Sequence, residues 1–319
     1  MKKICIMHQA SIGDTLLASP VYRAVKKNFP DAEVIAVTSP VGAELFRGNP
    51  YIDTLVEYKK GGAVLPVIKK IWRADAAIIL DYHYRNALFA FLAAIPKRIG
   101  RGKDFINCRV EELPAETFEP KKYLSLLEPL EIFEEDFSLT KIFPTDEEKN
   151  RVTELINAIK KPEQKLVTIA PYSLSPIKDW PSENYREIIR RSEASGNVAA
   201  ILGGKKDREL IKRNFAGVKN FAGETNLRES AEIISRADLQ ICGCTAMLHV
   251  CSTTSTPAIA IYGPTSPAQW APKKNCTVIS RNLPCSPCYN VPDKPPCNDN
   301  KCIKNISVDE VWAAAKNFL

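Results

Sequence analysis

The first residues that could do chemistry lie near the amino end, in residues 10–17. Gly13 permits a tight turn there, and Asp14 falls in the first turn of a predicted helix. A carboxylate at this place is favoured by the helix dipole. It can cap the helix, or it can take a proton from a substrate hydroxyl. Asp14 is therefore a candidate general base, with helix capping as the structural alternative.

Two further segments could bind an anion. Residues 170–181 form a polar loop in which Lys178 can neutralise a diphosphate or lie solvated at the surface, and Ser173 adds a hydroxyl. Residues 242–249 join a strand to a helix that begins at Thr245 or Ala246, where free backbone N–H groups favour an anion. His249 lies one turn further on, as a ligand contact or a core histidine. Residues 262–267 form a third hydroxyl-bearing loop, or a plain turn.

Short apolar runs must position these loops. Strands are predicted at residues 4–7, 33–37, 75–80, 166–170, 198–202, 239–242 and 258–262. Helical periodicity separates them, for example at residues 15–28, 85–94, 182–195 and 228–236. Alternation of this kind predicts an α/β protein with parallel sheets covered on both faces. Ligands in such sheets bind beyond the carboxyl ends of the strands.

The chain length and one linker predict two domains. The sequence has 319 residues, which suits two domains of ordinary size. Residues 160–165 resemble a linker between two doubly wound halves that face each other across a cleft. We therefore predict domains at 1–161 and 162–319, with a terminal helix that begins after Ser307 and could pack back on the first domain.

Composition excludes several classes of protein. Hydrophobic residues make up 45% of the chain, and no apolar run approaches the 20 or so residues that span a bilayer. The amino-terminal apolar run ends at Met7, too early for a signal peptide, so we expect a cytoplasmic protein. The net charge of +7 suits an anionic partner, but no nucleic-acid-binding signature is present. The dinucleotide fingerprint G-x-G-x-x-G and the P-loop are also missing.

In their order along the chain, these segments resemble glycosyltransferase family 9, the bacterial heptosyltransferases. The similar motifs are Ser11-Ile12-Gly13-Asp14, residues 75–81 with Arg85, Arg98-Ile99-Gly100, Lys178-Asp179-Trp180-Pro181, Gly203-Gly204, residues 245–249 and residues 262–267. The resemblance covers nearly the whole chain. It implies a GT-B fold with acceptor bound by the first domain and donor by the second, and inversion at the anomeric carbon without a metal ion.

The resemblance also implies roles for particular residues. Asp14 matches the catalytic base. The residues assigned to donor binding are Ser173, Lys178, Thr225, Cys244, Thr245, Ala246, Met247 and His249. Acceptor binding is assigned to His8, Ser11 and Arg85. The implied partners are a nucleotide-sugar, with ADP favoured, and a lipid-linked glycan, which suggests peripheral contact with the inner membrane.

Three positions depart from the family pattern. Cys244 stands where the family usually has Asp, Ala246 replaces a Gly, and His8 occupies a position that often carries Lys. A neutral thiol cannot hold sugar hydroxyls as a carboxylate does. The sequence therefore leaves three functions open: transfer, binding of a nucleotide sugar or glycan without transfer, and epimerisation of a nucleotide sugar.

Four of the ten cysteines lie close together near the carboxyl end. Cys285, Cys288, Cys297 and Cys302 have the spacing C-x2-C-x8-C-x4-C. Four such thiolates can form a structural zinc site, and an iron–sulfur cluster uses the same ligand type. Paired or free thiols are the alternative. Catalysis itself requires no cofactor in the expected mechanism.

Overall fold

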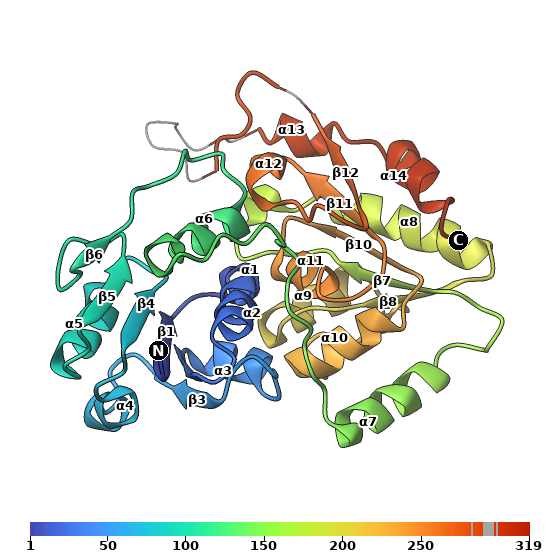
Figure 1. Cartoon of the computed structure of the whole chain (residues 1–319). Coiled ribbons are helices and arrows are strands. Elements are labelled where there is room, and N and C mark those ends of the chain that lie inside the picture. The colour runs from blue at the N-terminus through green and yellow to red at the C-terminus, as the bar shows by residue number, and fades with distance from the viewer. Residues whose placement is uncertain (282, 290–296, 298) are drawn as a thin grey trace. The chain divides into compact units, whose positions relative to one another are not determined.

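The computed structural model describes residues 1–281, 283–289, 297 and 299–319 of the chain (Figure 1). The chain forms two compact units, Met1–Phe143 and Pro144–Leu319. Each contains one sheet of six parallel strands, and both sheets are doubly wound. Two doubly wound parallel sheets are what the alternation of strands and helices predicts.

In the first unit the strand order is β3-β2-β1-β4-β5-β6. The strands are β1 (Lys3–His8), β2 (Glu33–Thr38), β3 (Thr54–Glu57), β4 (Ala76–Ile79), β5 (Lys97–Gly100) and β6 (Cys108–Arg109). The helices are α1 (Ile12–Leu17), α2 (Ser19–Asn28), α3 (Pro40–Phe46), α4 (Leu65–Ile71), α5 (Tyr84–Leu92), α6 (Glu119–Ser125) and the 3₁₀ turn η1 (Glu128–Leu130). The winding direction reverses between β1 and β4, which are neighbours in register from Ile4–Ala76 to Met7–Ile79.

In the second unit the order is β12-β11-β10-β7-β8-β9. The strands are β7 (Leu166–Ala170), β8 (Val198–Ile201), β9 (Lys219–Asn220), β10 (Leu239–Gly243), β11 (Ala258–Tyr262) and β12 (Cys276–Ser280). The helices are α7 (Asp146–Asn157), α8 (Ser182–Ala194), α9 (Arg208–Asn214), α10 (Leu227–Ser235), α11 (Ala246–Cys251), α12 (Pro267–Trp270), α13 (Lys301–Lys304) and α14 (Val308–Ala315), with the 3₁₀ turns η2 (Pro176–Lys178) and η3 (Lys205–Asp207). Here the winding reverses between β7 and β10.

The cores form because the central strands are apolar on both sides. Every residue of β7, β10 and β11 is buried, as expected for parallel strands with helices on both faces. In the first unit, Cys5 and Met7 of β1 pack with residues from α4 and α5 on one face of the sheet. Ile4 and Ile6 point to the other face and are also fully buried.

The helix predicted at residues 15–28 is two helices. Helix α1 ends at Leu17 and α2 begins at Ser19, with Ala18 between them. Pro20 lies at the amino end of α2, where its missing N–H costs nothing. In a continuous helix the ring of Pro20 would clash with the carbonyl of Leu16. The proline therefore accounts for the break.

The unit boundary lies earlier than the linker suggests, because α7 packs with the second unit. Helix α7 contacts α10, and Glu148 accepts hydrogen bonds from Arg228 Nη2 at 2.6 Å and Asn226 Nδ2 at 2.9 Å. A capping box between Thr145 and Glu148 begins this helix. The terminal helix α14 contributes Val311 and Ala315 to the second core, where it packs against α8.

Within the part of the chain that the structure describes, no helix is both long and apolar enough to cross a bilayer.

The buried pair of Glu148 and Arg228 generates a prediction. Burial raises the pKa of Glu148, but hydrogen bonds from Arg228, the Thr145 N–H and Asn226 outweigh it and lower the pKa below its usual value. A lowered carboxyl pKa stabilises the fold at neutral pH, and this contribution is lost as the pH falls through the folded-state pKa. Glu148→Gln leaves the buried Arg228 without a charge partner, so we expect a loss of about 3 kcal/mol at pH 7.

The measurement is urea denaturation of both proteins between pH 3.5 and 7.5. The difference should narrow as the pH falls below the usual range of a glutamate pKa and through the lowered folded-state pKa of Glu148, because the wild-type carboxyl then becomes protonated as well. Lys149→Ala is the matched control on the same helix. It breaks the exposed pair with Asp146, which is 3.0 Å long, and should cost no more than about 0.5 kcal/mol. Equal losses in both variants would contradict the packing of α7 described above.

Candidate functional site

Each unit presents polar loops at its winding reversal. In the first unit the loops after β1 and β4 are joined through Asp81. Its carboxylate accepts hydrogen bonds from the Gln9 N–H at 3.0 Å, the Asn86 amide at 2.7 Å and the His83 N–H at 3.1 Å. Burial raises the pKa of Asp81, although these hydrogen bonds oppose that effect. Asp81 thus holds the two loops together at the edge where ligands bind in such sheets.

Asp14 lies beside these loops and is not the capping residue of α1. The N-cap position belongs to Ser11, which makes no side-chain capping bond. The Ser11 hydroxyl instead donates to Asp14 Oδ2 at 2.7 Å. Asp14 is only half-buried, and its charge adds to the burial that raises the pKa of Tyr123. Its carboxylate therefore remains available to a ligand, beside an aromatic hydroxyl.

His8 is buried under the ring of Tyr123. Only 2% of His8 is exposed, and the two rings meet edge to face with 5.2 Å between centroids. Burial, helped by the charge of His83, lowers the pKa of His8 to about 3, so the imidazole is neutral at pH 7. His8 therefore cannot provide the positive charge that a Lys would provide at the same position.

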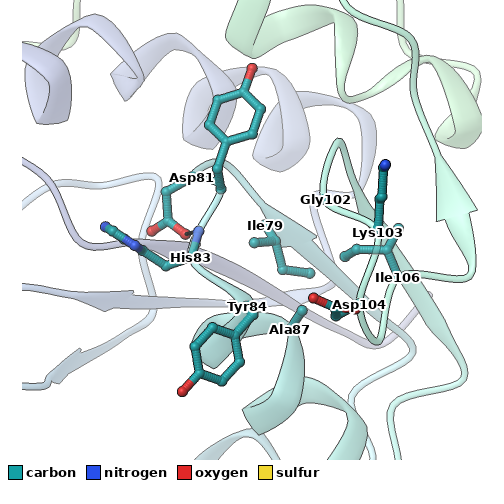
Figure 2. A pocket seen from close by; sticks show the side chains of 10 residues that line it. Ile79, Asp81, His83, Tyr84, Ala87, Gly102, Lys103, Asp104 and Ile106 are labelled. Carbon is teal, nitrogen blue, oxygen red and sulfur yellow. Dashed lines mark hydrogen bonds between the residues drawn. The ribbon is translucent and has the colours of Figure 1, made fainter.

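A small hollow that is open to solvent lies beside Asp81 (Figure 2). Asp81 and His83 lie on one side of it and Lys103 and Ile106 on the other, with Ile79 between them. Its lining also includes Tyr82, Tyr84, Ala87, Gly102 and Asp104. Arg85 is half-buried in the first turn of α5 and is not among the lining residues. The sequence predicts no role for His83 or Lys103. The loop after β5, which carries Lys103, lies close to the loop after β4, which carries His83, only in the folded chain.

In the second unit, the loops after β7 and β10 lie against each other. A Cβ added to Gly243 would lie 3.3 Å from the carbonyl oxygen of Lys178, so glycine permits this close approach. Lys178 lies near His249, and burial together with the charge of Lys178 lowers the pKa of His249 to about 4. The two residues that the sequence places 71 positions apart are thus brought to one edge of the sheet.

The loop after β7 is held by its own polar groups. Asp179 Oδ1 accepts the Ser173 N–H at 2.9 Å, and the Ser173 hydroxyl donates to the Ser175 carbonyl at 2.8 Å. Burial raises the pKa of Asp179 to about 6. The buried Trp180 anchors the end of the loop through an indole N–H bond of 3.0 Å to the carbonyl of Ile306. The backbone around Lys178 is therefore fixed before any ligand binds.

Three buried polar atoms at this edge have no hydrogen-bond partner within the described part of the chain. They are Thr245 Oγ1, His249 Nδ1 and Thr265 Oγ1, and they follow the neighbouring strands β10 and β11. Buried polar atoms are nearly always paired in folded proteins, so such a group indicates a missing ligand or water. Thr245 is the N-cap residue of α11 and uses no side-chain bond for capping.

The remaining donor-binding candidates differ in position. Cys244 is buried, whereas Ala246 and Met247 are half-buried in the first turn of α11. Thr225 precedes α10, and its hydroxyl lies 2.8 Å from that of Ser230. The structure therefore groups Lys178, Thr245 and His249, and it engages Thr225 in a local hydrogen bond.

The cysteine-rich segment does not form a metal site in the structure. None of the ten cysteines, all of which the structure describes, forms a disulfide. The thiols of Cys285, Cys288 and Cys297 lie near enough to add to the burial that raises the pKa of Cys302. Yet among the described residues, which include all four cysteines, no three His, Cys, Asp or Glu side chains are placed to hold a metal ion. Structural zinc at this segment is therefore not supported.

The chain is similar to known proteins over its full length. It is 24% identical to a lipooligosaccharide heptosyltransferase 2 of Campylobacter jejuni over 332 aligned positions, which cover 99% of this chain and 98% of the relative. A glycosyltransferase family 9 structure from Veillonella parvula aligns with a TM-score of 0.87 at 20% identity, covering 99% and 97% of the two chains. The E. coli ADP-heptose LPS heptosyltransferase II aligns with a TM-score of 0.81 at 20% identity, covering 100% and 98%.

These structures confirm the predicted GT-B class of fold. The family model described as glycosyltransferase family 9 (heptosyltransferase) matches residues 65–297. Since this match covers more than half of the chain, the protein belongs to glycosyltransferase family 9, the heptosyltransferases.

Proposed function

We propose that the protein transfers a heptose from ADP-heptose onto a sugar of a lipopolysaccharide core, with inversion and without a metal ion. The observation that carries the donor side is the set of unpartnered buried atoms of Thr245, His249 and Thr265 beside Lys178. A diphosphate with sugar hydroxyls offers both the negative charge and the hydrogen-bonding groups that such a site lacks. Membership in family 9 and similarity to a lipooligosaccharide heptosyltransferase support the heptose, and similarity to an ADP-heptose LPS heptosyltransferase supports the ADP.

The proposed reaction is a direct displacement. Asp14 takes the proton of an acceptor hydroxyl, and the oxygen attacks the anomeric carbon of the donor as the bond from that carbon to the diphosphate breaks. The new glycosidic bond has the opposite configuration, and ADP leaves. Lys178 stabilises the charge that develops on the departing diphosphate, which is where electrostatic stabilisation contributes most.

We place the acceptor in the first unit, over the hollow beside Asp81. Lys103 and the polar loop from Asp81 to Tyr84 offer groups for an acidic glycan. Asp14 follows the loop after β1, which the Gln9 N–H bond joins to Asp81.

The alternative is a protein that binds a nucleotide sugar without transferring it. Cys244 favours this alternative, because a thiol accepts hydrogen bonds from sugar hydroxyls far more weakly than the usual carboxylate.

A thermal-shift panel with ADP, UDP, GDP and CMP tests the donor. A ligand that binds only the folded state stabilises it by about 2.7 kcal/mol at 100 times its Kd, so ADP should raise Tm most. A larger shift with another nucleotide would replace ADP in the proposal. Binding of ADP without any transfer from ADP-heptose to heptose-deficient core oligosaccharide, followed by mass spectrometry, would establish the alternative function.

Replacement of Asp14 tests the base. Asp14→Asn should lower kcat on the order of 10²–10⁴-fold, the usual contribution of a general base, while the affinity for ADP stays unchanged. Asp31→Ala removes an exposed carboxylate of the same unit and serves as the control. Normal turnover by Asp14→Asn would exclude this residue as the base.

The location that we propose is the cytoplasmic side of the inner membrane, with helix α5 on the lipid surface. The solvent-facing side of α5 carries Tyr84, Leu88 and Phe91, which lie four and three residues apart and so share one face. Tyr84 and Phe91 are 64% and 50% exposed, and the helix contains no acidic residue. The same row begins at the hollow, because Tyr84 also lines it.

Basic side chains beside this row select an anionic membrane as its partner. The Arg98 guanidinium lies 5.5 Å from the centroid of the Phe91 ring, which also contacts Phe105 at 5.3 Å. Lys69 and Lys70 end the neighbouring helix α4, which packs against α5. Aromatic rings flanked by cations are typical of surfaces that insert at the headgroup level of anionic bilayers.

Vesicle co-sedimentation tests this surface. Substitution of both Phe91 and Leu92 by Ser should lower the affinity for phosphatidylglycerol-containing vesicles about tenfold, because two large side chains lose their burial in lipid. Phe133→Ser is the control, since Phe133 is 79% exposed elsewhere in the same unit. Equal binding by wild type and the double variant, with Tm unchanged, would refute the assignment of this surface.

A further inference from the structure

The cysteine-rich segment reaches the donor loop through Tyr289. The Lys178 ammonium lies 4.8 Å from the centroid of the Tyr289 ring, which is within the range of a cation–π contact. Lys178 belongs to η2, after β7, whereas Tyr289 comes directly after Cys288. The two residues are 111 positions apart in the sequence, so only the fold brings them together.

Backbone hydrogen bonds fix the ring in place. The N–H groups of Cys288 and Tyr289 both donate to the Pro264 carbonyl at 2.9 Å, and the Ser286 hydroxyl donates to the Gly263 carbonyl at 2.6 Å. The segment is therefore attached to the loop after β11, which also carries Thr265 with its unpartnered hydroxyl. Tyr289 is held through its own N–H group and through the two bonds made by the residues before it.

The lack of a side chain at Gly263 permits a second close contact with the loop after β11. A Cβ at Gly263 would lie 2.7 Å from the Cβ of Ile303 and 3.3 Å from the Sγ of Cys302, which is too close for any other residue without rearrangement. The chain after the cysteine-rich segment thus packs against the same loop. Both ends of the segment depend on the donor side of the second unit.

An aromatic ring and a carboxylate hold a lysine side chain in different ways. A carboxylate partner would neutralise the ammonium, whereas a ring face attracts it and leaves its full charge for another anion. Among the described residues, no ion pair joins Lys178 to a carboxylate. The nearby His249 is neutral at pH 7, since burial and the charge of Lys178 lower its pKa to about 4. The charge of Lys178 also acts on the neighbouring Asp179, whose pKa it lowers against the effect of burial, but the group that the ammonium contacts is the ring of Tyr289.

We propose that Tyr289 is a positioning residue of the donor site, which holds the Lys178 ammonium ready for the diphosphate of the nucleotide. This inference rests on the proposed function, in which Lys178 contacts the donor phosphates. It gives residues 286–289 a role that requires no metal ion, because they form part of the wall of the nucleotide site. Tyr289 acts through Lys178 and touches no reacting atom.

Calorimetric titration with ADP tests the proposal on the full-length protein. Tyr289→Leu should weaken ADP binding about two- to fivefold, the usual worth of a cation–π contact at a partly exposed site. Tyr289→Phe keeps the ring and should bind ADP like wild type. Lys178→Ala should lose on the order of tenfold or more, because it removes a charged contact to phosphate. Tyr289→Leu should have no further effect in the Lys178→Ala background.

Lys219→Ala is the matched control. Lys219 makes a similar contact, 5.1 Å from the ring centroid of Phe221 in the same unit, and its loss should leave ADP binding unchanged. The melting temperature of every variant reports whether it is folded. Titration with pyrophosphate, the group common to the candidate diphosphate donors, repeats the comparison without the nucleoside.

The outcomes separate this inference from the proposed function. The role of Tyr289 would be overturned, while the donor site stands, if Tyr289→Leu bound ADP with wild-type affinity. It would also be overturned if Tyr289→Leu lowered the ADP affinity equally in the wild-type and Lys178→Ala backgrounds. Wild-type affinity in Lys178→Ala, for both ADP and pyrophosphate, would overturn the donor site and the inference together. Weaker binding by Tyr289→Leu that Tyr289→Phe restores, and that disappears without Lys178, supports the proposal.

Discussion

The reversal of winding in each parallel sheet is the constraint on which the sites depend. In the first sheet the connections that follow β1 and β4 run in opposite directions, and in the second sheet those that follow β7 and β10 do so. No crossing chain therefore covers the carboxyl ends of either pair of strands. The loops at both edges are short and carry polar residues. Asp14 and Asp81 follow the first pair of strands, and Lys178 and Thr245 follow the second. The chemistry is therefore carried by loops, whereas the strands before them are buried and apolar.

Burial then decides which of these groups carry charge. The imidazoles of His8 and His249 lose their protons because a cation in a dry environment is costly, and both pKa values fall well below neutrality. Lys178 lies on a loop that is itself held by Asp179 and Trp180. The donor edge consequently brings the Lys178 ammonium together with the neutral imidazole of His249 and the hydroxyl of Thr245, an arrangement suited to a ligand with a compact anionic part and hydroxyls.

The cysteine-rich segment has a further role that its metal-like spacing does not suggest. Among the described residues no group is placed to hold a metal ion, and backbone and hydroxyl hydrogen bonds attach residues 286–289 to the loop after β11. The feature that ties it to the donor edge is Tyr289, a residue that no metal-ligand pattern includes. The domain boundary was similarly obscured: the Lys- and Pro-containing linker is real, but Glu148 and its partner Arg228 bind α7 to the second unit.

The sequence by itself determined the class of fold, the central strands of each sheet, and the loops that carry the candidate residues. Those features depend on local periodicity, turn residues and capping boxes, which are readable over a few neighbouring positions. Only the tertiary structure decided that His8 is buried and neutral, that Lys103 shares a hollow with Asp81, and that Tyr289 lies on Lys178. Contacts between residues distant in the chain depend on packing and burial. No local pattern in one sequence specifies which distant side chains packing will bring together.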